Sequence, residues 1–257
     1  MAFLISLASF SVALSQQPQK PSTPKKPSFV LTVKTQPIIN ISLKAEKARV
    51  SQVAHELSKR LKVPVQLGKE RQNELLTVEF SELTLEPALQ LLAPQVYVDY
   101  EIDTGALMPK PLAIYLFDAD QGEPPLSAAV HGSVQSMLIE GDTEDGAEPQ
   151  GDEAKKKLEE QPLRVTFENN LLTVKAKKQP LPLVLLKIGE EMGIPVEIQD
   201  TTVSIVDTEI SKLPIEDVVR QLSPHIRLFL RADLTRADKR ALRIVLSEQA
   251  QATQPNP

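Results

Sequence analysis

A segment of about eighty residues occurs twice in this chain. The stretch IGEEMGIPVEI at residues 188–198 repeats the apolar spacing of LSKRLKVPVQL at residues 57–67, with an offset of 131 positions. The match extends without a gap over residues 42–67, and it continues at an offset of 130 where LTLEPALQLLAPQV faces LPIEDVVRQLSPHI. A register kept over this length with one deletion is typical of a duplicated module. The sequence therefore predicts two similar domains.

Each copy predicts two helices among several short strands. The apolar positions of the first helix recur at helical spacing at Val50, Val53, Leu57 and Leu61. Pro64 ends this helix because proline lacks an N–H, and in the second copy Gly193 is expected to adopt the left-handed conformation of a helix end. A second short helix follows Thr84 as its N-cap, and alternating residues predict the strands, in the order β, β, α, β, β, α, β, β. We expect an α+β fold of two tandem small βαββαβ-type modules, each a small mixed sheet covered by two helices.

The domain boundaries follow from changes in composition. The N-terminal apolar run is shorter than a bilayer span and places the small residues Ala13 and Ser15 before a cleavage site, which favours a signal peptide over the alternative of a membrane anchor. The expected segments are a signal peptide at 1–15, a disordered Pro-rich spacer at 16–28, a first module with a C-terminal extension at 29–140, an acidic linker at 141–160, a second module at 161–247 and a disordered tail at 248–257.

The composition excludes several kinds of chemistry. The 257 residues include no cysteine, so the chain has no disulfide, no thiolate metal site and no cysteine nucleophile. A formal net charge of −5 without a basic patch argues against a nucleic-acid partner. The chain also lacks the glycine-rich phosphate motifs, the GxSxG nucleophile elbow and the GxxG loop of KH modules. We therefore expect no cofactor and no enzymatic activity.

Isolated ionisable residues give no catalytic or metal site. His55, His131 and His225 lack partners at metal-ligand spacing, so surface or structural roles are expected for them. The adjacent carboxylates Glu190 and Glu191 align with Lys59 and Arg60 in the first copy, which is typical of a solvated helix face. We expect no catalytic residue and no bound metal.

The strand HIRLFLRAD supplies the candidate partner-binding residues. Its core-facing positions, which match apolar residues of the first copy, are Ile226, Leu228 and Leu230. Arg227, Phe229 and Arg231 are then expected on the opposite face, because side chains alternate along a strand. An exposed Phe between two arginines is enriched at protein interfaces. The alternative is that this face packs against the sister module or the preceding hairpin.

The stretches INISLKAEKARVSQVAHELSKRLKVPVQL, LTVEFSELTLEPALQLLAPQVYVDYEI and LAIYLF resemble the short N-terminal domain shared by secretins and TonB-dependent receptors. That family has an I-x-L-x-A strand, a helix leading into VPV, a VxFxxLTLExALxxLL segment and a final xIxL strand. Residues 38–117 cover the whole domain, and residues 171–246 resemble it more loosely. The resemblance implies a periplasmic module that docks another protein. The ring-forming domains and barrel of a secretin, and the plug and barrel of a receptor, have no counterpart in residues 1–257, so no pore or receptor is expected.

These observations predict an exported, non-catalytic protein-interaction module of the bacterial cell envelope, periplasmic or associated with the outer membrane. Its expected partner is a protein of a secretin, pilus or TonB-type assembly, bound by strand addition at a sheet edge, with no transmembrane segment after signal cleavage. One alternative is a self-assembling structural accessory subunit of a secretion or pilus apparatus. Another is a periplasmic small-ligand-binding protein, which requires a concave pocket with convergent polar groups.

Overall fold

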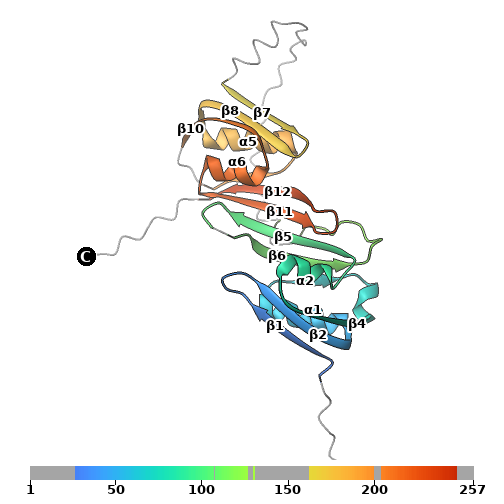
Figure 1. The fold of residues 1–257 in the computed structure, drawn as a ribbon. Helices are drawn as coiled ribbons and strands as arrows, with labels where there is room; N and C mark the ends of the chain where they lie inside the picture. Colours follow the sequence, from blue (N-terminus) through green and yellow to red (C-terminus); the bar gives the residue numbers. More distant parts are fainter. Residues whose placement is uncertain (1–26, 107, 127–129, 131–161, 200–203, 248–257) are drawn as a thin grey trace, which may run out of the picture.

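The computed structural model describes residues 27–106, 108–126, 130, 162–199 and 204–247 (Figure 1). The predictions for the signal peptide, nearly all of the Pro-rich spacer, the acidic linker, the tail and His131 lie outside these residues. The described part is a mixed α+β fold with more strand than helix. None of its helices is long and apolar enough to cross a membrane.

Both halves of the described chain have the element order β, β, α, β, β, α, β, β. In the first half the elements are β1 (Phe29–Lys34), β2 (Asn40–Arg49), α1 (Val50–Leu61), β3 (Val65–Leu67), a 3₁₀ turn (Glu70–Asn73), β4 (Leu75–Thr84), α2 (Leu85–Gln90), β5 (Gln95–Asp103) and β6 (Lys110–Phe117). In the second half they are β7 (Leu163–Glu168), β8 (Leu171–Pro180), α5 (Leu181–Met192), β9 (Val196–Ile198), β10 (Ile205–Leu213), α6 (Ile215–Leu222), β11 (Ile226–Asp233) and β12 (Asp238–Leu246).

The strands form three sheets, and this arrangement differs from one small sheet per half. β1-β2-β4 and β10-β8-β7 are three-stranded end sheets, while β3-β6-β5-β11-β12-β9 is a central sheet shared by both halves. Figure 1 shows the end sheets at opposite ends of the described part, with α5 and α6 between one end sheet and the central sheet. Helix α5 contacts β7 and β8 on one side and β9 and β12 on the other. The helices are therefore sandwiched between two sheets instead of covering one.

The two halves meet where β5 pairs antiparallel with β11. In this register Tyr100 lies opposite Leu230, and these two residues are equivalent positions of the sequence repeat. The hydrogen bonds at the two ends of the junction are also equivalent: Thr104 N to Ile226 O at 3.1 Å and Leu234 N to Val96 O at 3.0 Å. Each contact between β5 and β11 thus has a counterpart in which the two halves exchange roles. Pairing of this kind places an approximate two-fold axis at the Tyr100–Leu230 pair.

Fine structural details recur in both halves. Glu82 and Lys212 have positive φ values of 54° and 50°, each at a register shift between two strands of an end sheet. Their backbone N–H groups donate to the hydroxyls of Ser42 and Thr173, at 2.9 and 3.2 Å. A cross-strand ion pair also recurs, as Lys44–Glu79 and Lys175–Glu209.

The apolar core runs without interruption through both halves. Its largest fully buried members include Leu43, Leu57, Leu89, Ile114, Leu172, Leu185, Ile188 and Leu228. Each such side chain stabilises the fold by about 1.5–3 kcal/mol relative to exposure. Gly193 ends α5 with a φ of 66°, which confirms its predicted conformation, and Lys62 ends α1 in the same conformation. Thr84 precedes α2, but its side chain makes no capping hydrogen bond.

Candidate functional site

The central sheet has two faces, and only one of them packs on the helices. The face opposite the helices, here called the far face, carries Asp99, Tyr115, Phe229, Arg231 and Arg243. Residues 118–126 and Val130, here called the covering segment, contact this face through the Arg231 and Arg243 side chains and the apolar cluster around Phe229. The far face is therefore not free surface where β5, β6, β11 and β12 meet.

The exposure predicted for Phe229 and Arg231 is wrong. Phe229 is 5% exposed and packs with Val130, Leu242 and Val245, while Arg231 is 3% exposed. Their face is buried because the covering segment, which belongs to the predicted first module and its extension, crosses it. Packing against the sister module, the alternative weighed for these residues, is what is observed here.

Arg231 is held by a complete set of acceptors. Its guanidinium donates to both carboxylate oxygens of Asp99, at 2.7 and 3.0 Å, and to Glu123 Oε1 at 3.1 Å. It also donates to the backbone carbonyls of Pro124 and Pro125 and lies 5.1 Å from the centre of the Tyr115 ring. Burial by itself lowers the pKa of Arg231, but the hydrogen bonds and charge of Asp99 outweigh it and raise the pKa. The group is a permanent cation that ties β11 to β5 and to the covering segment.

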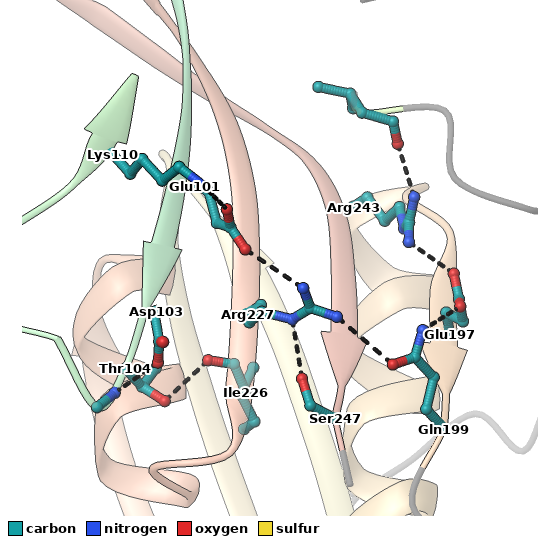
Figure 2. Close-up of polar contacts among 12 residues, drawn as sticks. Glu101, Asp103, Thr104, Lys110, Glu197, Gln199, Ile226, Arg227, Arg243 and Ser247 are labelled. Atoms are coloured by element: carbon teal, nitrogen blue, oxygen red, sulfur yellow. Dashed lines mark hydrogen bonds and ion pairs between the residues drawn. The ribbon is translucent and has the colours of Figure 1, made fainter. Parts of the chain in front are cut away.

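Arg227 is the most exposed of the three predicted residues, with a side chain 35% exposed. Figure 2 shows it at the centre of a polar network that runs across the junction from Lys110 to Arg243. The successive contacts are Lys110–Glu101 at 3.6 Å, Glu101–Arg227 at 3.4 Å, Arg227–Gln199 at 3.4 Å, a Gln199–Glu197 hydrogen bond and Glu197–Arg243 at 2.7 Å. Arg227 Nε also donates to Ser247 Oγ at 2.8 Å.

This network joins strands from both halves. The hydroxyl of Ser247 accepts a hydrogen bond from Arg227 Nε, and among the described residues no hydrogen bond joins this hydroxyl to a histidine or a carboxylate. Within the ranges that the structure covers, no group of three or more His, Asp or Glu side chains could hold a metal ion. The geometry is that of an internal junction in which three cations, Lys110, Arg227 and Arg243, are bridged by two carboxylates and one amide.

Two concave grooves lie beside the equivalent short helices α2 and α6 and share part of their lining positions. The first groove, of about 590 Å³, is lined mainly by apolar side chains: Ile38, Ile39, Leu85, Ile102, Met108 and Leu230. The second groove, of about 930 Å³, is lined by Phe167, Leu171, Met192, Ile194, Ile215 and Leu242 among others. Both volumes fall in the range of about 300–1,000 Å³ that is usual for ligand sites.

The grooves share polar residues at matching positions of the repeat. Glu86 and Glu216, each in the first turn of its helix, line the first and the second groove, respectively. Glu86 accepts a hydrogen bond from Tyr100 Oη at 3.0 Å, whereas Glu216 lies 3.5 Å from Lys239 Nζ. Burial, followed by the charge of Glu86, raises the pKa of Tyr100, so its phenol remains protonated and donates to the carboxylate.

Sequence reasoning missed these grooves, although one signal for them was present. Glu86 and Glu216 align in LTLEPAL and LPIEDVV, so a carboxylate recurs one residue into each short helix. The apolar lining gave no comparable signal, since its residues come from separate strands and turns that only the tertiary fold brings together.

Comparison of this chain with models of known protein families, with curated proteins and with solved structures finds no match. What the grooves do must therefore follow from their own residues.

Proposed function

We propose that this protein is an exported, non-catalytic docking protein of the bacterial cell envelope, built from two copies of one small βαββαβ-type module. The observation that carries this proposal is the pair of grooves beside α2 and α6, each mainly apolar and each carrying one glutamate at the same position of the repeat. A protein partner binds in these grooves.

The recurrence of structural detail supports duplication of a module. Positive φ angles, hydroxyl acceptors, cross-strand ion pairs and junction hydrogen bonds fall at equivalent positions in the two halves. The shared central sheet then fixes the two grooves relative to each other. Two sites on one rigid body raise the effective concentration of the second site once the first is bound.

Docking fits the grooves better than catalysis does. Each groove offers mainly apolar surface. In the first groove Glu86 accepts a hydrogen bond from Tyr100, whose raised pKa keeps the phenol protonated, so this tyrosine does not act as a base. Ile38 and Met108 line the first groove and are 45% and 53% exposed. Exposed large apolar side chains that gather around a concavity are typical of interaction sites.

The placement in the cell envelope depends on two sequence features. The apolar run at residues 1–15 is typical of a signal peptide, and residues 38–117 resemble the short N-terminal domain of secretins and TonB-dependent receptors. The protein is then periplasmic or associated with the outer membrane, and its partner belongs to a secretin, pilus or TonB-type assembly.

A self-assembling accessory subunit is the second candidate. Its support comes from β4 and β10, which lie at the edges of their end sheets and, among the described strands, pair on one side only. A free strand edge can pair with a second copy or accept an added strand of a partner. The volume of the first groove also suits a small apolar ligand.

Site-specific photocrosslinking in the host cell tests the proposal. A photoreactive phenylalanine replaces Ile38 or Met108 in the first groove, and Leu183 of α5, which is 46% exposed and lies outside both grooves, provides the matched control. We expect the two groove positions, but not position 183, to crosslink an envelope protein that mass spectrometry then identifies. A product made only of two copies of this chain would support self-assembly instead, and equal products from all three positions would contradict a groove-specific partner.

A further inference from the structure

The first groove holds a carboxylate, that of Glu86, which forms no ion pair with the residues that the structure describes. We propose that Glu86 binds a lysine or arginine side chain of the partner and that apolar residues beside this cation fill the groove. This inference rests on the proposed docking function and specifies the chemistry of the docked segment.

The second groove shows how the same carboxylate is satisfied within the chain. Glu216 has a side chain that is 17% exposed, and Lys239 Nζ lies 3.5 Å from its carboxylate. The position equivalent to Lys239 in the first half is Pro109, which has no amine. Among the residues that the structure describes, no ion pair includes Glu86, whose carboxylate accepts a hydrogen bond from Tyr100. A cation from the partner would therefore take the place in the first groove that Lys239 takes in the second.

The surroundings of Glu86 favour a cation with apolar neighbours. Met108 and Ile38, both largely exposed, line the groove together with Ile39 and Pro111. Covering these side chains removes apolar surface from water, and an ion pair formed beside them is less screened than one on open surface. The groove therefore selects for an amphipathic segment instead of a purely charged one.

Two lysines limit how basic the segment can be. Lys110 and Lys239 also line the first groove, and each is already paired with a glutamate, Lys110 with Glu101 at 3.6 Å and Lys239 with Glu216 at 3.5 Å. A run of several basic residues would meet these like charges. The expected ligand is a single lysine or arginine between apolar residues.

Three matched synthetic peptides test the inference on the full chain. Each is acetylated, amidated and of the form Ser-Leu-Val-X-Val-Leu-Ser, with X as lysine, norleucine or glutamate. Binding is followed by NMR through the methyl signals of Met108 and Ile38. For the wild-type protein we expect the lysine peptide to bind about tenfold more tightly than the norleucine peptide and more tightly still than the glutamate peptide, as for a charge-assisted hydrogen bond.

Three variants separate the role of Glu86 from that of the groove. Glu86→Gln keeps an acceptor for Tyr100 and should remove the preference for lysine over norleucine. Glu209→Gln, the matched control, changes a glutamate that lines neither groove and is paired with Lys175, and it should leave that preference unchanged. Pro109→Lys supplies in the first groove the amine that Lys239 supplies in the second, and it should weaken binding of the lysine peptide. Circular dichroism and thermal melting establish that each variant is folded.

The outcomes distinguish this inference from the proposed function. Equal binding of the lysine and norleucine peptides to the wild type would overturn the cation inference while leaving the groove as a docking site. A preference for glutamate would assign selection to Lys110 and Lys239 and would also overturn it. If no peptide shifts the Met108 and Ile38 signals, both the inference and docking at this groove fail.

Discussion

The bidentate pair of Asp99 and Arg231 is the polar contact on which the junction of the two halves depends most. Asp99 is 0% exposed, and its two oxygens receive three hydrogen bonds, two from Arg231 and one from Tyr115. We expect Asp99→Asn to lower the free energy of unfolding by about 3 kcal/mol, because it removes the buried bidentate counter-charge of the guanidinium and leaves only the partly exposed carboxylate of Glu123. Chemical denaturation measures this loss.

A surface pair provides the control for that measurement. Lys44 and Glu79 lie 2.8 Å apart, with side chains 69% and 67% exposed, so Glu79→Gln should cost less than about 1 kcal/mol. Equal losses for Asp99→Asn and Glu79→Gln would mean that burial of the Asp99 pair adds nothing to the junction.

Tyr100 makes stability depend on pH in the alkaline range. Burial first, and the charge of Glu86 second, raise its pKa above the value of about 10 for an unfolded tyrosine. Because the folded state keeps the proton that the unfolded state releases, the contribution of Tyr100 is fully present below about pH 10 and is lost as the pH rises toward the folded pKa. The free energy of unfolding should fall above about pH 10, by up to about 1.4 kcal/mol per pH unit for this group.

Tyr100→Phe removes the titrating group and isolates its effect. This variant should lose about 0.5–1.5 kcal/mol near neutral pH with the hydrogen bond to Glu86, and its stability should then depend less steeply on alkaline pH than that of the wild type. Urea unfolding at three pH values gives both slopes. Parallel slopes would assign the alkaline dependence to other groups.

The helices and strands were predictable at the scale of elements, but the pairing between elements was not. Apolar residues at helical spacing, such as Val50 to Leu61, identify an element because its own residues form the pattern. The pairing of β5 with β11 depends on which strands remain at free edges after each half has folded, and no periodicity records this. Alternation alone predicts Phe229 and Arg231 to be exposed, since residues 118–126 of the covering segment, DADQGEPPL, have no pattern that places them over this face.

The equivalent helices α1 and α5 end in different residues, and substitutions at these two ends are expected to change stability in opposite directions. Lys62 and Gly193 occupy the same left-handed position, with φ values of 58° and 66°. Lys62→Gly should stabilise the protein by up to about 1 kcal/mol, whereas Gly193→Ala should destabilise it by about 1–2 kcal/mol, because a side chain makes this conformation unfavourable. A Cβ at position 193 has no neighbour within 4 Å, so the cost comes from the backbone alone.

Denaturant midpoints of the two variants, measured beside the wild type, check these signs. Shifts in the same direction would show that contacts of the Lys62 side chain, and not backbone conformation, decide the effect at this helix end.

At the scale of the whole molecule, the shared central sheet and continuous core make the two halves one folding unit. The strand pairing of β5 with β11, the Asp99–Arg231 pair and the covering segment all cross the junction. Elements joined in this way are expected to unfold together, in a single cooperative transition. Separate modules on a flexible linker would instead unfold one after the other.

The distribution of tyrosines provides a direct test of this cooperativity. The chain has no Trp, and its three tyrosines, Tyr97, Tyr100 and Tyr115, all lie in the first half. Tyrosine fluorescence therefore reports the first half, while far-ultraviolet circular dichroism reports both. We expect the two signals to change at the same urea concentration in the wild type and to separate in Asp99→Asn if the variant weakens the junction more than it weakens either half. Different midpoints already in the wild type would mean that the central sheet does not couple the halves, and the two grooves would then not be held at a fixed spacing for one partner.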